Sequence, residues 1–166
     1  MRKREHGDSM TLETIDFAHY EKLWHQYGAI WKWDNPFITP PWLKAWHRVF
    51  GGGKEPLLTT ASSNLGPMGV APLMVEGTDA RLIGSADLCD TGDVVVAPDG
   101  KQRFFAELCN FLESHQINRL VLEPVRQDST VYSMARASEN TERWHCTITP
   151  MSQSLEMELP GSWQAY

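Results

Sequence analysis

The sequence predicts a single α/β domain built on a mixed, mostly antiparallel central sheet that is flanked by about four helices. Two patterns support this fold class. Apolar residues recur at helical spacing in four segments, and short β-prone runs separated by Gly, Pro, Asn and Asp turns lie between them. The composition agrees, because 42% hydrophobic and 22% charged residues in a chain of 166 are typical of one globular domain.

The first elements are a strand and a helix. Met10–Ile15 is a β-prone run, and Asp16 after it is a residue type that favours the N-cap of a helix. Aromatic residues then follow at helical spacing: Phe17, Tyr20, Trp24 and Tyr27. Gly28 is expected to end this helix.

A second helix is expected after Thr39, a residue type that favours the N-cap and is followed by Pro40 and Pro41 in the first turn. Its apolar residues are predicted to share one buried face: Trp42, Leu43, Trp46, Val49 and Phe50. Gly51-Gly52-Gly53 should end the helix, because glycine accepts left-handed backbone angles. The following Lys54 gives this run some likeness to a phosphate loop. However, it follows a helix rather than a strand, and Glu55 stands where Ser or Thr is needed.

Three short β-prone runs then predict an antiparallel meander: Leu57–Thr60, Met68–Val75 and Ala80–Ile83. Pro72 has no amide donor, so we expect a bulge or a sheet edge there. Val94–Val96 is apolar throughout and is predicted to be a strand buried on both faces.

The remaining elements alternate between helix and strand. Asp99 is expected to cap a third helix, whose apolar face comprises Phe104, Phe105, Leu108, Phe111 and Leu112. Leu120–Leu122 should be a buried strand, and Asp128 and Ser129 should cap a fourth helix that ends near Asn140. Alternating patterns in 144–148 and 155–159 predict two final strands.

Charge and composition restrict the class of protein. The formal net charge is −6 and basic residues cluster only at Arg2-Lys3-Arg4, so we expect no nucleic-acid partner. The start lacks the apolar core of a signal peptide, and no stretch has the length of a membrane span. These features predict a cytoplasmic protein. The three cysteines are widely spaced among apolar neighbours, which favours reduced core thiols.

Common catalytic and metal-binding motifs are absent from the sequence. It has no His-Glu-x-x-His, Cys-x-x-Cys or Gly-x-Ser-x-Gly pattern, and its six histidines share no metal-ligand spacing. We therefore expect no metal. An aromatic concentration at Trp31, Trp33, Trp42 and Trp46 allows two interpretations, core packing or a surface that stacks on a sugar or acyl group, and core packing is favoured.

The best local site candidate is the acidic segment 85–93, which places Asp87, Asp90 and Asp93 between two predicted strands. Three carboxylates this close are suited to general-base chemistry or to binding hydroxyl and amine groups. Ordinary turn chemistry, in which Asp side chains bind nearby backbone amides, explains the same residues equally well. The sequence leaves both interpretations open.

The order of the elements resembles the GNAT acyltransferase fold. Particular segments sharpen the likeness to the N-terminal half of CelD-type GNAT acyltransferases, a family associated with cellulose biosynthesis and similar in plan to the FemAB peptidyltransferases. These segments are Phe37–Trp46 with Phe50-Gly51, Gly69–Met74, Leu82–Asp90 and Leu159–Trp163. In that family two GNAT-like domains are joined in tandem, and the second binds acyl-CoA.

This resemblance implies a division of the chain and of its function. Residues 1–160 are expected to form the first GNAT-like domain, and 161–166 to begin the connection to a C-terminal catalytic domain that this sequence does not include. The whole protein would transfer an acyl group from acetyl-CoA or another acyl-CoA to an amine or hydroxyl of a glycan or cell-envelope precursor. This half would shape the acceptor groove, with Trp42, Asp87, Asp90 and Asp93 as candidate contacts. A non-catalytic scaffold or binding module is the alternative.

The resemblance places acyl-CoA outside this half, although one segment matches a GNAT cofactor loop in its letters. Arg81, Gly84 and Ala86 fit the form Arg/Gln-x-x-Gly-x-Gly/Ala. A pyrophosphate site also needs a helix N-terminus directly afterwards, whereas this match is followed by three carboxylates and a strand. We interpret it as a chance match.

Overall fold

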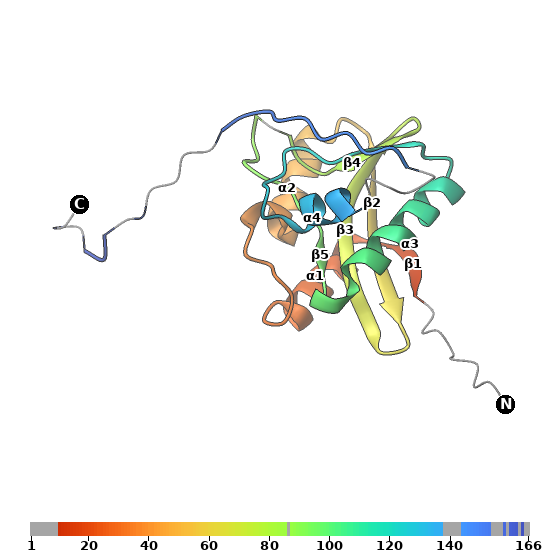
Figure 1. Ribbon diagram of the computed structural model, residues 1–166, viewed down its shortest axis with the longest axis horizontal. Coiled ribbons are helices and arrows are strands. Elements are labelled where there is room, and N and C mark those ends of the chain that lie inside the picture. Colours follow the sequence, from red (N-terminus) through yellow and green to blue (C-terminus); the bar gives the residue numbers. More distant parts are fainter. Residues whose placement is uncertain are drawn as a thin grey trace.

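The computed structural model describes residues 10–85, 87–137, 144–153, 158, 160–162 and 164. It confirms a mixed α/β domain with a six-stranded, mostly antiparallel sheet and four α-helices (Figure 1). The strands are β1 (Thr11–Ile15), β2 (Glu55–Ser63), β3 (Gly66–Glu76), β4 (Asp79–Leu82), β5 (Val95–Val96) and β6 (Arg119–Val121). The helices are α1 (Phe17–Tyr27), α2 (Pro40–Phe50), α3 (Lys101–Ser114) and α4 (Thr130–Ala137).

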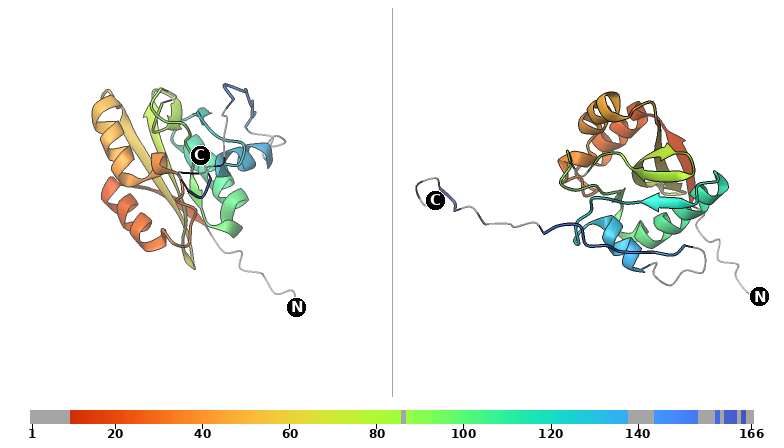
Figure 2. Two further views of the ribbon diagram at one scale, coloured as in Figure 1. Left: turned by 90° about the vertical axis from the view of Figure 1, so that its left-hand side faces the viewer. Right: turned by 90° about the horizontal axis from the view of Figure 1, so that it is seen from above.

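The sheet is sandwiched between two helical layers, with α1 and α2 on one face and α3 and α4 on the other (Figure 2). Each layer encloses its own apolar cluster. The α1/α2 layer packs around Tyr20, Leu43 and Trp46, whereas the α3/α4 layer packs around Phe104 and Leu108. Because β3 is central, side chains that alternate along it contribute to both clusters.

Strand order is β1-β2-β3-β4-β6, and β5 also pairs with β3. All pairs are antiparallel except β4 with β6, which the α3 crossover makes parallel. β5 pairs with Gly69 and Val70, whose other neighbours lie in β2, and therefore lies on the same edge of β3 as β4. β4 and β5 are thus two parts of one interrupted strand, and residues 83–94 leave the sheet between them. We call residues 83–94 the acidic excursion.

The interruption explains Pro72, which lies neither at an edge nor in a bulge, contrary to the sequence-based expectation. Pro72 is in the middle of β3, and its carbonyl accepts a hydrogen bond from the Ile83 N–H on the β4 side. The side of Pro72 that lacks an amide N–H therefore faces the gap between β4 and β5, where no strand would accept a hydrogen bond from it. The bulge lies instead in the β2–β3 ladder at Ala61/Ser62.

Both predicted helices of the first layer are present. Asp16 caps α1 by accepting a hydrogen bond from the His19 N–H at 2.7 Å. Thr39 is the N-cap residue of α2, but its hydroxyl donates to the Pro36 carbonyl and does not cap the helix. Gly52 and Gly53 follow α2 with φ of 58° and 78°, so the glycine run is a helix end as predicted.

One face of α2 was predicted wrongly at its C-terminal end. Val49 is 62% exposed and Phe50 is 53% exposed, whereas Leu43 and Trp46 are buried. The buried residues of this helix are Pro40, Leu43 and Trp46, so its buried face does not extend into the last turn. Gly51-Gly52-Gly53 follow directly, and the chain enters β2 at Glu55.

In the second layer, three predictions need correction. Asp99 does not cap α3, because a short 3₁₀ turn, Pro98–Gly100, precedes the helix and Gly100 is the N-cap residue. The strand β6 is half-buried and not fully buried, since it lies at one end of the sheet and its Arg119 is exposed. Ser129 does cap α4, by accepting from the Tyr132 N–H, but Asp128 forms an ion pair with Arg126.

The predicted strand at 144–148 is wrong. Residues 144–150 have no strand partner within the described part of the chain, and Ile148 is 39% exposed. Trp144 is anchored by its indole N–H, which donates to the Glu113 carboxylate at 2.8 Å. An alternating pattern forms a strand only where a neighbouring strand pairs with it. Most of the second predicted strand, 155–159, and the end of α4 near Asn140 lie outside the described residues.

Candidate functional site

The candidate site lies at the carboxyl ends of β4 and β6, the one parallel pair among the described strands. Ligands of α/β sheets commonly bind at such ends, because the loops that follow parallel strands converge there. The acidic excursion leaves β4 at this edge, and residues 122–129 leave β6. A hydrogen bond from the Gly92 N–H to the Pro124 carbonyl, at 2.6 Å, joins the two segments.

Asp93 is turned away from solvent and into the N-terminus of α4. Its carboxylate accepts hydrogen bonds from the backbone N–H groups of Val94, Thr130 and Val131, each at 2.8 Å. Burial raises the pKa of the Asp93 carboxyl, and these hydrogen bonds act in the opposite direction. The carboxylate therefore satisfies amides that an α-helix leaves without partners. Asp93 thus makes the backbone contacts that the turn-chemistry interpretation predicts.

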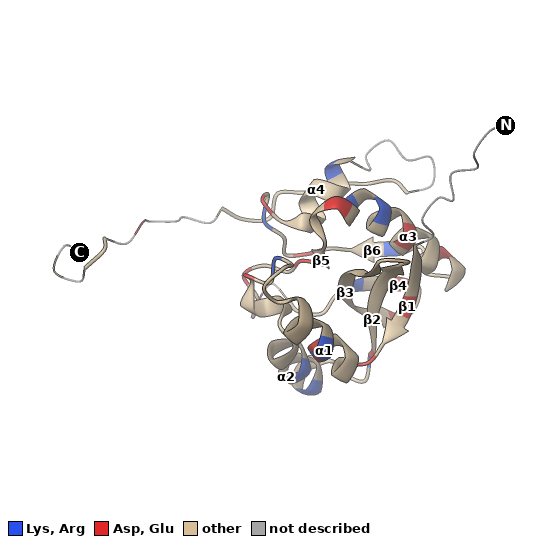
Figure 3. Ribbon diagram, turned by 90° about the horizontal axis from the view of Figure 1, so that it is seen from below, with Lys and Arg blue, Asp and Glu red and all other residues tan. Residues whose placement is uncertain are grey.

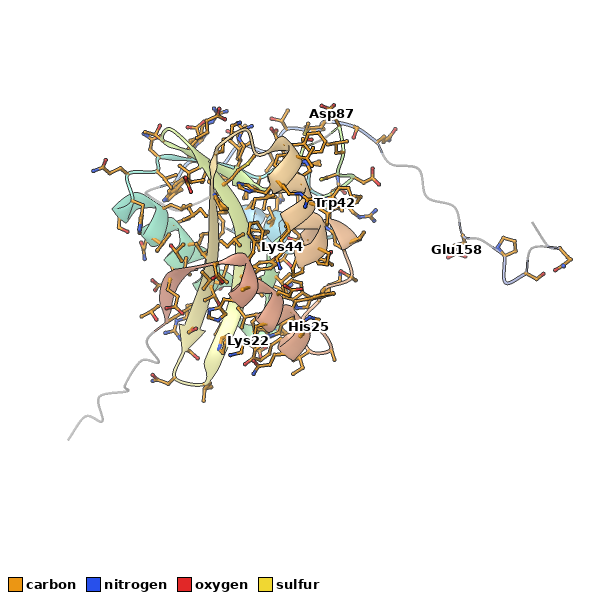
Figure 4. All side chains as sticks on the ribbon, turned by 180° about the vertical axis from the view of Figure 1, so that it is seen from behind. Lys22, His25, Trp42, Lys44, Asp87 and Glu158 are labelled. Carbon is orange, nitrogen blue, oxygen red and sulfur yellow. The ribbon has the colours of Figure 1, made fainter. Side chains whose placement is uncertain are left out.

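Asp87 and Asp90 are both exposed on the same excursion. Between them, Leu88 is 42% exposed while Cys89 is buried against the α1/α2 layer. The turn is closed locally, since the N–H groups of Leu88 and Cys89 donate to the Ser85 carbonyl. Asp87 lies at the upper rim of the molecule, above Trp42 (Figure 4). These two carboxylates remain available to bind hydroxyl or amine groups.

Trp42 lies on α2, half-buried, and packs against the same apolar cluster as Cys89. Its ring meets Phe37 edge to face, with centroids 5.2 Å apart. The loop before α2 is tied to the acidic excursion, because the Asn35 amide donates to the Thr91 carbonyl at 3.1 Å. The structure thus links the segments that carry Trp42 and the two exposed carboxylates.

The aromatic concentration is a core feature, as favoured from the sequence. Trp31 and Trp46 are buried, and Trp31 stacks on Tyr27 with centroids 4.5 Å apart. Tyr20, fully buried in the same cluster, donates its hydroxyl to the Ile38 carbonyl at 3.0 Å. Burial, and then the charge of Asp93, raise the pKa of Tyr20. The stacked rings therefore belong to the core of the described domain and do not form a continuous exposed platform.

The Arg81-x-x-Gly84-x-Ala86 match is not followed by a helix. Arg81 lies in β4, and the chain then enters the turn around Leu88. Gly84 has φ of 142°, and a Cβ atom there would approach the Cys89 sulfur to 3.1 Å. The local backbone therefore requires glycine at this position. Ala86 lies outside the described residues.

Sequence reasoning did not find three groups that hold this site together: Asn35, the Gly92–Pro124 contact and the first amides of α4. Asn35 carries a local signal, since it precedes Pro36 and caps a 3₁₀ turn by accepting from the Phe37 N–H. Its second role, toward Thr91, spans 56 positions and has no sequence signature. The contacts with α4 are equally remote along the chain.

Charged side chains elsewhere on the domain form surface ion pairs. On the outer face of α2, where Figure 3 shows basic residues, a shallow depression of about 230 Å³ is lined by Pro41, Lys44, Ala45 and Arg48. Lys44 there is paired with Glu21 of α1.

Neither a metal cluster nor a membrane span is found in the part of the chain that the structure describes. These residues contain no group of three or more His, Cys, Asp or Glu side chains arranged to hold a metal ion. Within the same residues, no helix combines the length and the apolar character needed to cross a bilayer.

Comparison of the chain with models of known protein families, with curated proteins and with solved structures finds no match in any of the three.

Proposed function

We propose that this domain is the acceptor-binding half of a GNAT-like acyltransferase. The full protein would move an acyl group from acyl-CoA to an amine or hydroxyl of a glycan or cell-envelope precursor. The observation that carries the proposal is the order of elements. Apart from the short β5, it runs β1-α1-α2-β2-β3-β4-α3-β6-α4, which is the order, through the fourth helix, on which the sequence resemblance rests.

The resemblance implies that acyl-CoA binds in a second domain, and the position of Asp93 supports this at one helix, α4. Backbone amides at a helix N-terminus are suited to holding a pyrophosphate, but at the start of α4 a carboxylate of the domain already occupies them. A second anion there would face direct charge repulsion. We therefore assign acyl-CoA to another domain of the same protein and assign the acceptor groove to the segments around Trp42, Asp87 and Asp90.

In the proposed reaction, a general base removes a proton from the acceptor amine or hydroxyl, and the freed electron pair attacks the thioester carbonyl. The tetrahedral oxyanion is stabilised by N–H donors, and the CoA thiolate leaves and takes up a proton. Asp87 and Asp90 would accept hydrogen bonds from acceptor hydroxyl or amine groups and so fix its orientation.

Two measurements test this proposal. A thermal-shift titration of the isolated chain with acetyl-CoA should leave its melting temperature unchanged; clear stabilisation would show that the donor binds here and would refute the division of labour. The longer protein that the proposal requires should release free CoA thiol when given acetyl-CoA and a panel of amino sugars and polyols. No release with any acceptor argues against the acyltransferase.

The alternative is a non-catalytic scaffold, which the framework role of Asp93 favours. Asp87→Ala and Asp90→Ala distinguish the two functions when they are assayed in the longer protein. The acceptor groove predicts a raised KM for the acceptor with normal folding. The scaffold predicts unchanged activity.

A further inference from the structure

Three consecutive residues of the acidic excursion are hydrogen-bonded to three different segments of the domain. The carbonyl of Thr91 accepts a hydrogen bond from the side-chain amide of Asn35, in the loop before α2, at 3.1 Å. The Gly92 N–H donates to the Pro124 carbonyl, in the segment after β6, at 2.6 Å. The Asp93 carboxylate accepts from the first two amides of α4, each at 2.8 Å. These three residues therefore connect the α1/α2 layer to α4 and to the segment that precedes it.

The chain passes from one apolar cluster to the other over the same few positions. Cys89 is buried in the α1/α2 cluster, whereas Val94 is buried in the α3/α4 cluster. Gly92 lies between them in close contact with β4, because a Cβ atom there would be 2.9 Å from a side-chain carbon of Leu82. Closely packed groups transmit a displacement to their neighbours. A shift at one end of this short stretch is therefore felt at the other.

Further contacts extend this connection into the α1/α2 layer. The side-chain oxygen of Asn35 accepts from the Phe37 N–H at 2.9 Å, so the residue that binds the excursion also caps the 3₁₀ turn before α2. Tyr20 of α1 donates its hydroxyl to the Ile38 carbonyl of that turn at 3.0 Å. Burial, and then the charge of Asp93, raise the pKa of Tyr20. The carboxylate that binds α4 therefore also lies near enough to α1 to act on its tyrosine.

We propose that residues 91–93, which we call the relay, couple the loop before α2 to the N-terminus of α4, so that a change at either one alters the other. Residues that share one hydrogen-bond network affect one another's stability, and such coupling is reciprocal. The relay directly follows the exposed turn that carries Asp87 and Asp90. A ligand or partner that fixes this turn would therefore also stabilise the start of α4. The proposal concerns coupling within the domain and does not depend on the acyltransferase function.

Amide hydrogen exchange at single residues, followed by NMR in the ¹⁵N-labelled chain, measures this coupling. Asn35→Ala removes the bond to Thr91 and should raise the exchange rates of the Thr130 and Val131 N–H groups, which belong to the other layer, by about fivefold or more. In the opposite direction, Asp93→Asn weakens the hold on α4 and should raise the exchange rate of the Phe37 N–H by a similar factor. Both changes are taken relative to amides of β3, at the centre of the sheet, which report general stability.

Thr39→Val is the matched control for Asn35→Ala. It removes another side-chain hydrogen bond of the same loop, from the Thr39 hydroxyl to the Pro36 carbonyl at 2.7 Å, but this bond does not involve the relay. Exchange at Thr130 and Val131 should stay unchanged in this control. If Asn35→Ala does not fold, Asn35→Asp replaces it, because a carboxylate keeps the oxygen that caps the 3₁₀ turn and lacks the donor to the excursion.

Three results overturn the relay. The first is unchanged exchange at Thr130 and Val131 in the Asn35 variant, relative to the amides of β3. The second is an equal rise throughout the chain or in Thr39→Val, which reports general destabilisation. The third is a rise in one direction only, because coupling between two sites acts equally on both. A selective rise in both directions supports the relay whether or not the longer protein transfers an acyl group.

Discussion

The Asp93 carboxylate accepts a hydrogen bond from the Thr130 N–H at 2.8 Å, across 37 positions of the sequence. It connects the excursion that follows β4 to the helix that follows β6. A carboxylate at this position also interacts favourably with the dipole of α4. Asp93 thereby fixes both loops at the edge of the sheet where the acceptor groove is proposed.

Replacing Asp93 by alanine should destabilise the domain by about 2 to 3 kcal/mol, because it removes three hydrogen bonds to a charged acceptor, two of which satisfy the first amides of α4. Urea unfolding followed by circular dichroism measures this difference. Asp90→Ala removes the same charge from an exposed position and should change stability by less than about 0.5 kcal/mol. Equal effects of the two variants would contradict the capping role.

Gly69→Ala should destabilise the domain by about 2 kcal/mol through overpacking. A Cβ atom on Gly69 would lie 2.8 Å from the Val95 carbonyl oxygen and 3.0 Å from the Phe104 ring, which would force β5 and α3 away from β3. Gly161→Ala is the control, because a Cβ there meets nothing within 4 Å. Thermal unfolding of both variants checks the prediction, and an unchanged melting temperature for Gly69→Ala would refute this packing.

The two ends of α2 should respond differently to substitution. Leu43→Ala removes a fully buried side chain and should cost about 3 kcal/mol, whereas Val49→Ser changes a residue that is 62% exposed and should cost less than about 0.5 kcal/mol. Urea midpoints measure both. A large loss with Val49→Ser would show that the last turn of α2 is covered in solution.

Cys109 should be unreactive in the folded protein. Burial, and then the nearby Glu113 charge, raise the pKa of its thiol to about 12, so almost no thiolate exists near neutral pH. Iodoacetamide at about pH 8 should leave Cys109 unmodified in the native chain and modify it fully in urea, as peptide mass spectrometry reports. Rapid native labelling of Cys109 would contradict the packing of α3.

Acid should weaken the contact between α1 and α2. The hydrogen bond and charge of Lys44 lower the pKa of Glu21 from 4.5, so this contribution to stability is present above that value and is lost as pH falls through the folded-state pKa. Glu21→Gln should therefore lessen the fall in the urea midpoint between about pH 6 and about pH 3. Glu55→Gln leaves the Glu21–Lys44 pair intact and should retain the full fall. An identical fall in Glu21→Gln and the parent would refute the contribution.

Local chemistry was predicted well where the relevant residues are neighbours in sequence. The cap at Asp16, the end of α2 at Gly52 and Gly53, and the meander of β2, β3 and β4 all depend on short patterns. Pro72 was misjudged because its tolerance depends on a gap created by residues 83–94.

The candidate site was less predictable, for the same reason. From the sequence, an Asp that caps its own turn cannot be distinguished from one that caps a helix 37 positions later. Asp93 is partly buried, whereas Asp87 and Asp90 are exposed to solvent. This difference arises only when the loops pack together, so the sequence does not reveal it.

The interruption between β4 and β5 leaves a segment whose exposed residues do not determine the register of the sheet. β4 and β5 are each registered on β3 by their own pairings, Leu73–Glu76 with one and Gly69–Val70 with the other. The exposed positions Asp87, Leu88 and Asp90 can therefore be exchanged without shifting either register, whereas Cys89 between them is buried in the α1/α2 cluster and is part of the core. Under the proposed function, acceptor preference would change by substitution at these exposed positions while the sheet beneath them stays the same.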